Sequence, residues 1–469
     1  VSRNKKKIIA IKDDEMIIQK AYKFRSYPTQ VQKDFFHQSM GNERFTYNYF
    51  SSLNLERQEN GLTFFSNDEM DKLLTSLKGE KDFLRKSNSQ SLQKVTKDVK
   101  RAIDTFFRRI KKKDSPNIKP FNFKKKSNSK ESFSFPCNKN NIHFKHDYKI
   151  DENSKNKGQF VYLTIPKMKT PLKILKHRNW EGTIKNVTIS KDIDDYYVSI
   201  QVESVILKKE IKKDLNSYIG IDKGVVKLAT LNNGQWFDPI NTYKTHQIQL
   251  AKLQNKLSKK QDFNKLQKKN FNDLKKENEY FQPSNNYLNL QKKIAKLHRK
   301  IKRIRHEYLH HISNYLTQNY SYIMMEDLNT KNMTKSEIGT IDSPNPNRSQ
   351  KKWLNRSILD QGWGILKEYT QYKSQWNNKI LTLVNPRNTS KACSRCQHIA
   401  DDNRESQSIF VCKSCGHQMH ADVNAALNVL VNGLVKLNFS LDEIKSIINP
   451  WTKGVLELDK PIVLSKQLV

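Results

Sequence analysis

The chain has 469 residues and a formal charge of +38 at pH 7, from 85 Lys and Arg against 47 Asp and Glu. That length allows two to four domains with ample core, and the excess of cations points to a polyanionic partner. The bias of an AT-rich genome toward Lys contributes to the excess but does not account for all of it. The sequence has no apolar run near the ~18 residues of a membrane-spanning helix, and we expect no signal peptide. We therefore expect nucleic acid as the partner and no membrane.

The N-terminal part of the chain predicts a strand followed by helices. Residues 17–27 alternate as a strand in which Lys23 and Arg25 stand among aromatic residues. Basic and aromatic side chains together suit contact with a sugar-phosphate backbone and stacked bases, and an amphipathic edge strand is the alternative. Residues 30–60 have helical periodicity, and Ser66 is a suitable N-cap for a second helix.

A third predicted helix, residues 89–113, has an apolar stripe on one face and cations on the other. The cationic face is either solvated or a nucleic-acid surface, with Arg101, Arg108 and Arg109 as candidate contacts. From residue 115 to 203, short β-type runs alternate with polar segments, which predicts a small barrel or a twisted sheet. Residues 17–27 would supply its first strand, so the helices would be an insertion into a β domain.

Two acidic residues end apolar strands in the second half of the chain. Asp222 ends the run SYIGID, and Glu326 ends the run SYIMME. Burying an unpaired carboxylate costs free energy, so we expect each of these acids to have a specific role. Between them, residues 246–316 predict a helical hairpin with apolar residues at heptad spacing. Its cations either face solvent or line a channel for a nucleic-acid duplex, and the candidate contacts are Lys292, Lys293, Lys296, Arg299, Lys300 and Arg303.

The segment after the second acid is polar. Residues 329–352 contain two prolines and a glycine and predict a loop, which is either a lid over the acids or a plain connection. Arg387 is a candidate contact to the scissile strand, with an ordinary surface arginine as the alternative.

Cys393, Cys396, Cys412 and Cys415 form two C-x2-C pairs separated by fifteen residues. Two such knuckles offer four thiolates to one tetrahedral zinc, which indicates a metal site in a reducing compartment. Asp422 follows directly, in the first turn of a predicted apolar helix. It is either a helix cap or a ligand of a second, catalytic metal.

An Asp on one strand, a Glu on another and an Asp on a helix is the carboxylate order of ribonuclease H-like nucleases. Such sites hold two divalent ions about 4 Å apart, one to activate water and one to stabilise the leaving oxygen. Hard carboxylates suit Mg²⁺ or Mn²⁺, whereas thiolates suit zinc. Asp222, Glu326 and Asp422 are therefore the candidate catalytic residues and magnesium ligands.

The segments GIDKGVVKLAT and MMEDLN, and the cysteine segment that runs into HADVNAALN, resemble the transposon-encoded TnpB family. The likeness extends from about residue 17 to 432. It implies an RNA-guided DNA endonuclease, with Asp222, Glu326 and Asp422 as the acids of a RuvC-like domain and the four cysteines as zinc ligands. It also implies a guide RNA, a short flanking DNA motif, and cleavage of double-stranded target DNA that is complementary to the guide.

With this resemblance, we expect a multidomain α+β protein of the prokaryotic cytoplasm, with a monomer favoured. An oligonucleotide-binding-like β-barrel (wedge) with an inserted helical recognition domain would precede a ribonuclease H-like (RuvC) α/β nuclease domain with an inserted zinc ribbon. The predicted boundaries are 1–28 for the N-terminal segment and first wedge strand, 29–113 for the recognition domain, 114–210 for the wedge, 211–390 for the nuclease domain, 391–418 for the ribbon, 419–432 for the final nuclease helix and 433–469 for a tail.

Three other interpretations are open. A compact type V CRISPR effector would use the same chemistry and would be distinguished by a repeat array near its gene. A nuclease-dead, RNA-guided repressor is disfavoured because this chain keeps all three acids. A zinc-ribbon DNA-binding accessory factor of transposition would bind DNA without RNA.

Overall fold

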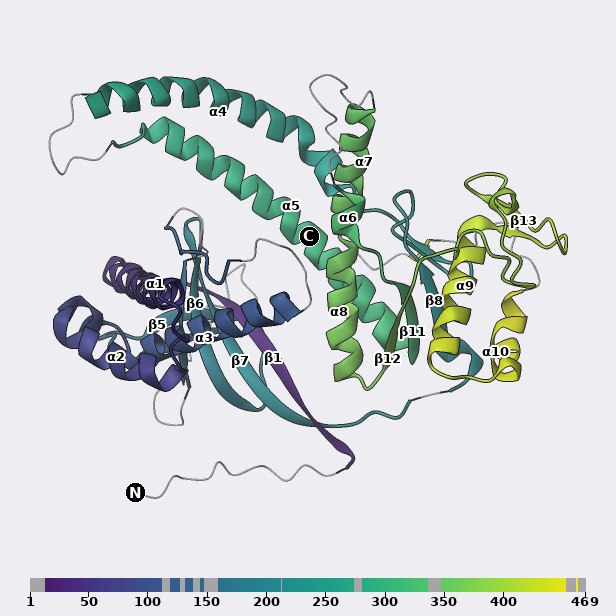
Figure 1. The fold of residues 1–469 in the computed structure, drawn as a ribbon, viewed down its shortest axis with the longest axis horizontal. Coiled ribbons are helices and arrows are strands. Elements are labelled where there is room, and N and C mark those ends of the chain that lie inside the picture. Colours follow the sequence, from purple (N-terminus) through teal and green to yellow (C-terminus); the bar gives the residue numbers. More distant parts are fainter. Residues whose placement is uncertain are drawn as a thin grey trace. The chain divides into compact units, whose positions relative to one another are not determined.

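The computed structural model describes residues 13–111, 119–126, 131–137, 144–146, 159–211, 213–273, 281–335, 347–452 and 461–462. The chain divides into two compact units, Val1–Leu207 and Lys208–Val469 (Figure 1). Within the described ranges, no helix is both long enough and apolar enough to cross a membrane.

The first unit is built on an antiparallel sheet of seven strands in the order β2-β6-β7-β1-β5-β4-β3. Its longest pairing joins β1 to β7 from Glu15 opposite Leu207 to Ser26 opposite Tyr196. This confirms that the N-terminal strand belongs to the β domain. Among the described residues β2 and β3 are the edge strands, so closure into a barrel stays a prediction. The strands are β1 (Glu15–Ser26), β2 (Ser132–Pro136), β3 (Phe144–His146), β4 (Gln159–Leu163), β5 (Leu172–Lys176), β6 (Thr183–Asp192) and β7 (Asp195–Leu207).

Three helices and a 3-10 turn are inserted between β1 and β2. The first turns of α1 and α2 are fixed by capping boxes, in which Thr29 and Ser66 each bond the backbone three residues on. Phe36 of α1 packs into the core of the sheet, whereas Phe50 packs with α2 and α3. The predicted helices are therefore confirmed as α1 (Gln30–Glu59), α2 (Asn67–Glu80) and α3 (Ser89–Lys111), with the 3-10 turn at Asp82–Lys86.

The second unit contains a sheet of five strands in the order β10-β9-β8-β11-β12. The pairs β8–β11 and β11–β12 are parallel, whereas β9 runs antiparallel to both β8 and β10. The strands are β8 (Tyr218–Asp222), β9 (Ala229–Leu231), β10 (Trp236–Phe237), β11 (Tyr322–Glu326) and β12 (Ile380–Val384).

Helices cover both faces of this sheet. The side chains of each strand alternate between the two faces, so each strand packs against helices on both sides. Ile219 and Ile323 point to one face, where they pack with helices α5 and α8. Tyr218 and Met324 point to the other, where they pack with α9 and α10. The helices are α4 (Thr242–Asp273), α5 (Asn285–Asn319), α6 (Thr330–Met333), α7 (Arg348–Gln361), α8 (Trp363–Trp376), α9 (Ala421–Lys436) and α10 (Leu441–Ile448), with 3-10 turns at Leu215–Ser217, Asp401–Asn403 and Asn449–Trp451.

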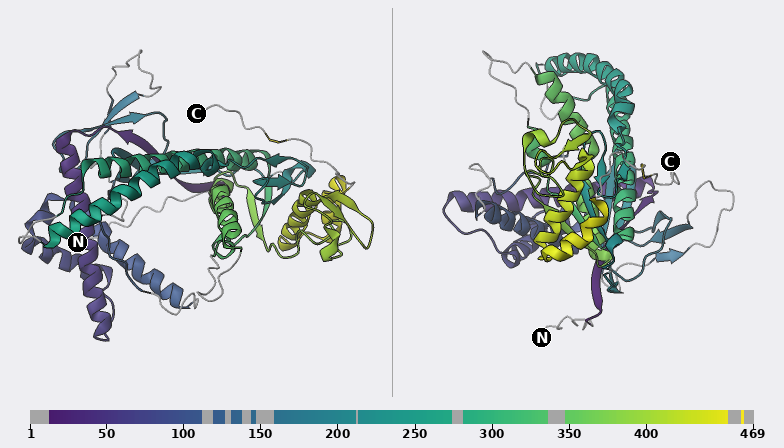
Figure 2. Two further views of the ribbon diagram at one scale, coloured as in Figure 1. Left: turned by 90° about the horizontal axis from the view of Figure 1, so that it is seen from above. Right: turned by 90° about the vertical axis from the view of Figure 1, so that its right-hand side faces the viewer.

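Helices α4 and α5 form the predicted hairpin, an extended arm in which they run side by side (Figures 1 and 2). Leu250 of α4 packs against Leu297 and Ile301 of α5. These two α5 residues lie at the heptad-spaced apolar positions predicted from the sequence. The apolar stripe of α5 therefore packs against α4 at the base of the arm.

The loop predicted over residues 329–352 is wrong at both ends. Asn329 caps the short helix α6, and α7 begins at Arg348. The middle of that loop lies outside the described residues. Beyond residue 432, the chain continues α9 to Lys436 and adds α10, whose Ile444 and Ile447 join the core beside the sheet. This part of the predicted tail is therefore packed structure.

Candidate active site and metal centre

The ends of two neighbouring strands bring Asp222 and Glu326 together. In the parallel pair, Ile221 of β8 lies opposite Met325 of β11, so the two acids occupy the next position of the register. Because strand side chains alternate, both acids share the face of Gly220 and Met324, which is the face covered by α9. The two carboxylates therefore lie beneath that helix.

Two glycines allow helix α9 to pack closely against this face of the sheet. A Cβ atom at Gly220 would lie 2.1 Å from the carbonyl oxygen of Ala426, and one at Gly433 would lie 2.1 Å from Cγ of Met324. Only glycine permits so close an approach of helix to sheet. With the helix at that distance, its first turn places Asp422 close enough to act on the charge of Asp222.

The three acids affect one another electrostatically. Burial, followed by the carboxylates of Glu326 and Asp422, raises the pKa of Asp222 to about 8. Burial also raises the pKa of Glu326. A divalent cation at this position would offset the repulsion, and carboxylate oxygens are the donors that hard cations prefer, so the residues fit such an ion. Among groups of three or more His, Cys, Asp and Glu in the described part of the chain, however, only the four cysteines have all their ligand atoms within 4.8 Å of one another.

Glu326 is 5% exposed and has two neighbours that hold it in place. The hydroxyl of Thr389 donates to its Oε1 atom at 2.8 Å. The Nζ atom of Lys223, one residue beyond Asp222, donates to its backbone carbonyl at 2.6 Å. Burial lowers the pKa of Lys223 to about 8. These bonds join the ends of β8 and β11 to the segment that leads into the cysteine knuckles.

Asp422 is held by cations and by its own helix. Arg404 donates to its Oδ1 atom at 3.1 Å, and Lys227 lies 4.0 Å from its Oδ2 atom. Its backbone N–H donates to Nδ1 of His420, which caps α9. The capping role considered for Asp422 therefore belongs to His420, and the carboxylate of Asp422 is directed to other partners.

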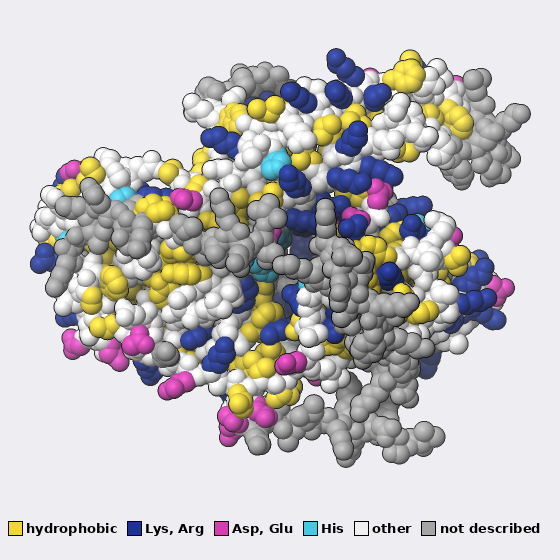
Figure 3. All heavy atoms as spheres, turned by 180° about the vertical axis from the view of Figure 1, so that it is seen from behind, with side chains coloured by type: hydrophobic (Ala, Val, Ile, Leu, Met, Phe, Trp, Pro, Cys, Tyr) yellow, Lys and Arg dark blue, Asp and Glu magenta, His cyan; other side chains and the backbone are white. Residues whose placement is uncertain are grey.

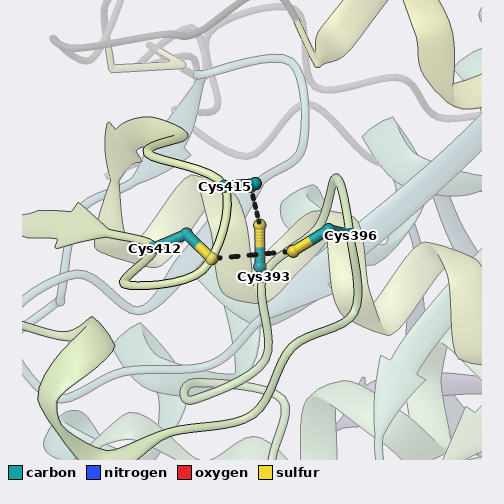
Figure 4. A group of neighbouring side chains, drawn as sticks. All are labelled: Cys393, Cys396, Cys412 and Cys415. Carbon is teal, nitrogen blue, oxygen red and sulfur yellow. Dashed lines mark hydrogen bonds between the residues drawn. The ribbon is translucent and has the colours of Figure 1, made fainter.

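The four cysteines form the second centre (Figure 4). The Sγ atoms of Cys393 and Cys415 are 3.8 Å apart, and those of Cys396 and Cys412 are 3.6 Å apart. A zinc ion with Zn–S bonds of about 2.3 Å separates tetrahedral thiolates by about 3.8 Å, so the spacing fits zinc. As the sequence indicates, these residues can hold one structural ion.

The two knuckles have the same backbone geometry. The N–H of Gln397 donates to Cys393 O, and the N–H of Gly416 donates to Cys412 O. Gln397 and Gly416 both have positive φ, at 62° and 67°. Asn403 joins the knuckles, because its side chain donates to His398 O and accepts from the N–H of Lys413. The repeated C-x2-C spacing therefore folds into two matching turns.

Two asparagines fasten the first knuckle to α9. Asn424 donates to Ala392 O at 2.8 Å and accepts from the N–H of Ser394 at 2.9 Å. Asn428, one turn later, donates to Ala392 O and Thr389 O. Since Thr389 also bonds Glu326, a short chain of hydrogen bonds links the metal centre to the acidic site.

Thr389, Arg404, Asn424 and Asn428 are not among the residues predicted from the sequence. A signal for the asparagines exists, because they recur four residues apart on an otherwise apolar helix and must be bonded if they are buried. Thr389 and Arg404 lie in polar loops, and nothing in their local pattern distinguishes them.

The structure gives most of the predicted nucleic-acid contacts of the first unit a protein partner. Arg25 pairs with Asp195 of β7 at 2.7 Å, and Lys23 lies over the ring of Tyr197 at 4.2 Å. Arg101 pairs with Asp98, and Arg108 bonds Thr105. Arg101 and Arg109 also line one hollow of about 500 Å³ with Lys119 and Lys124.

In the second unit the predicted cations lie along α5. Lys293 lines a hollow against α4, and Lys300 is exposed. Arg387 is exposed on the loop before Thr389, where its N–H donates to Asn385 Oδ1. The remaining α5 candidates, Lys292, Lys296, Arg299 and Arg303, already have interactions within the chain.

Comparisons with known proteins place the chain among insertion-sequence proteins. Residues 195–337 match the OrfB_IS605 family, described as "Probable transposase". Residues 16–61 match its "Helix-turn-helix domain", where the structure has β1 and the single helix α1. Residues 363–429 match the "Cas12f1-like, TNB domain", which covers both knuckles and the start of α9.

Two relatives cover most of the chain. The chain is 34% identical over 419 residues to "Putative RNA-guided DNA endonuclease InsQ" of Escherichia coli (strain K12), which covers 88% of this chain and 92% of that protein. It is 25% identical over 425 residues to a "Putative RNA-guided DNA endonuclease" of Streptomyces pristinaespiralis, covering 89% and 90%. A solved structure of the mini-RNA-guided endonuclease CRISPR-Cas_phi3 is 12% identical, with a TM-score of 0.46 over 88% of this chain and 92% of that one.

The matches to OrfB sequences define the class as transposon-encoded proteins. The chain belongs to the TnpB family.

Proposed function

We propose that the protein is an RNA-guided DNA endonuclease that hydrolyses phosphodiester bonds. The observation that carries the proposal is the meeting of Asp222 and Glu326 under the first turn of α9, which carries Asp422. The names of the relatives that span most of the chain agree with this reading. The order and directions of the five strands support a ribonuclease H-like, RuvC-type nuclease domain, and the sheet of the first unit supports an oligonucleotide-binding-like wedge.

The acids would hold two Mg²⁺ or Mn²⁺ ions, which supply Lewis-acid stabilisation of the phosphate and of the attacking and leaving oxygens. Asp222 and Glu326 provide ligands from the rigid ends of paired strands, and Asp422 provides a ligand from the helix. Thr389 fixes the rotamer of Glu326 through its bond to Oε1. Arg404 places a permanent positive charge beside Asp422, where it can also meet a phosphate oxygen of the substrate strand.

Target choice would rest on base pairing to a bound guide RNA and on a short flanking motif read by the protein. The net positive charge of both units suits binding to the phosphates of RNA and DNA without reading their sequence.

The first test is to sequence the RNA that co-purifies with the protein when it is expressed with its native flanking DNA. A single species ending in a segment that matches neighbouring DNA supplies the guide for a cleavage assay with Mg²⁺. Asp222→Asn and Glu326→Gln should then reduce cutting by at least about a thousandfold, while RNA binding stays intact, because both variants keep the fold but lose ligand charge.

Asp327→Asn is the matched control. Asp327 follows Glu326 but is half-exposed and pairs with Lys367 at 2.6 Å, so its variant should still cut. If the Asp222 and Glu326 variants cut as well as the wild type, the acids are structural and the nuclease proposal fails.

A second candidate is a CRISPR-associated effector with the same chemistry. The match of residues 363–429 to a Cas12f1-like domain favours it, as does 34% identity over 91 residues to a protein named as the Cas12f1 endodeoxyribonuclease of Sulfoacidibacillus thermotolerans. Repeat-derived sequence in the bound RNA would identify this class. If no specific RNA is bound, a zinc-ribbon DNA-binding accessory factor becomes the better interpretation.

A further inference from the structure

A hollow of about 800 Å³ lies between α4 and α5, away from the acids along the arm. Sites for small molecules typically measure about 300–1,000 Å³. The apolar contacts between the helices extend to Leu253 and Ile294. Further along the arm, the N–H of Ser284 donates to Oδ1 of Asn264 at 3.3 Å and ties the helices together again. The residues that line the hollow lie between these apolar contacts and this hydrogen bond. The hollow is therefore formed by the packing of α4 against α5.

The lining is cationic. Lys256, Lys259 and Lys260 contribute from α4, and Lys293 contributes from α5. Among the described residues, the lining includes no Asp or Glu, and none of these four ammonium groups forms an ion pair. Figure 3 shows Lys and Arg side chains gathered along this arm. Four like charges around one hollow repel one another, and a bound phosphate would relieve that repulsion.

An aromatic ring and several amides complete the lining. Phe263 lines the hollow and is 59% exposed, so its ring is accessible to a ligand. Asn286 and Asn289 line the same hollow from α5. An aromatic ring can stack on a base, amides can bond the edges of that base, and ammonium groups can bind the adjoining phosphates. The three kinds of side chain together match one unstacked nucleotide.

We propose that this hollow binds an unpaired nucleotide of the guide RNA. The proposal rests on the RNA-guided function proposed above and assigns part of the RNA affinity to the arm. Loops and single-stranded segments of the guide RNA present unstacked bases before any target is bound, whereas target DNA offers unpaired bases only in the displaced strand, after the guide has paired. RNA is therefore the occupant that fits a site for a single base.

The charge of the site is tested with the double variant Lys259→Gln/Lys260→Gln. The probe is an in vitro transcript of the co-purified RNA, titrated against the full-length protein at several salt concentrations. Each lost phosphate contact lowers the slope of log affinity against log salt by about 0.7, so the slope should fall by about 1.4. The control Lys265→Gln/Lys268→Gln removes two exposed cations of the same helix outside the hollow and should leave the slope unchanged.

The ring is tested separately. Phe263→Ala should weaken RNA binding about tenfold at fixed salt with an unchanged salt slope, because a stacking contact carries no charge. Phe263→Trp should bind as tightly as the wild type. Leu266→Ala is the matched control, since Leu266 is 57% exposed on the same helix and lies outside the hollow.

The outcomes separate this inference from the proposed function. If the Phe263 and lysine variants bind RNA as their controls do, the inference fails, while a wild-type protein that still binds RNA and cuts DNA keeps the proposed function. If the variants weaken only target-DNA binding by the assembled complex, the hollow belongs to DNA and the RNA assignment is overturned. A wild-type protein that binds no RNA overturns the proposed function itself.

Discussion

At the scale of single residues, the position of Glu326 depends on side chains other than the three acids. The single hydroxyl proton of Thr389 is shared between two acceptors, Glu326 Oε1 at 2.8 Å and Pro386 O at 2.9 Å. Asn428 in turn bonds the carbonyl of Thr389 from α9. The carboxylate of Glu326 is therefore oriented by a residue that its own turn at Pro386 and helix α9 hold in place.

Thr389→Val should slow DNA cleavage about tenfold without changing RNA affinity. The substitution keeps the shape of the side chain but removes the donor to Glu326, and a lost hydrogen bond to a charged group costs about 1.5 kcal/mol. Single-turnover cleavage rates with saturating guide would measure the effect. Thr389→Ser keeps the hydroxyl and should restore the rate. Equal rates for the Val and Ser variants would contradict the positioning role.

In the first unit, Glu43 is a partly buried acid that joins α1 to its neighbours. It accepts hydrogen bonds from the Ser91 hydroxyl of α3 and from the N–H of Ser134 on β2. Burial outweighs these bonds and raises the pKa of Glu43 to about 7. The folded state therefore keeps this proton up to about pH 7, whereas the unfolded chain loses it near pH 4.5.

The contribution of Glu43 to the free energy of unfolding should fall as the pH rises from about 4.5 to 7 and then stay constant. Glu43→Gln cannot ionise, so it should be more stable than the wild type above pH 7, by up to about 3 kcal/mol. The advantage should vanish near pH 4.5. Urea titrations at several pH values, followed by hydrogen exchange of amides in α1 and α3, would measure it, and a difference independent of pH would refute the prediction.

At the scale of elements, α9 organises the second unit. Its close approach at Gly220 and Gly433 places Asp422 over the sheet, and its asparagines hold the first knuckle. Arg404 lies in the segment between the two cysteine pairs, and its guanidinium donates to the carboxylate of Asp422. A metal ion at the cysteines would thus act on the acidic site through the positions of Arg404 and Thr389.

Removal of zinc should abolish DNA cleavage and spare most of the RNA affinity. We expect about one zinc per chain by elemental analysis, and Cys412→Ser or treatment with a strong chelator should release it. Without the ion the knuckles lose their cross-link, because structural zinc sites contribute folding energy directly. RNA affinity should persist if the first unit and the arm carry it. Full cleavage by a zinc-free protein in excess Mg²⁺ would show that the ribbon is dispensable.

Sequence patterns predicted the elements of this protein better than their contacts. Strand alternation and helical periodicity located β1 and α1, because burial of one face imposes a period that the sequence must keep. Continuous apolar runs located β8 and β11, because these strands are buried on both faces. The cysteine spacing predicted the four-cysteine cluster for a different reason, because two C-x2-C knuckles can present four thiolates to one metal ion. The polar run at residues 329–352 hid α6 and the start of α7, because exposed helices need little apolar periodicity. The bonds of Thr389 and Arg404 are tertiary, and no local pattern encodes them.

At the scale of the whole molecule, positive charge is distributed over both compact units. Residues 1–207 contain 42 Lys and Arg against 24 Asp and Glu, and residues 208–469 contain 43 against 23. The arm is the most cationic part of the second unit, since α4 and α5 hold 16 Lys and Arg against three Asp and Glu. A nucleic-acid partner that contacts one unit alone would leave about half of the excess positive charge without a phosphate partner.

The affinity for guide RNA should therefore depend steeply on salt. If each unit neutralises several phosphates, log affinity should fall with log salt with a slope of at least about −4, from roughly 0.7 per contact. Filter binding or fluorescence anisotropy between 50 and 500 mM salt would measure this slope. The isolated first unit, if it folds alone, should give a shallower slope than the full chain, because the contacts of the arm are missing. A flat dependence in the full-length protein would mean that the charge serves solubility, and that RNA is held mainly by shape and stacking.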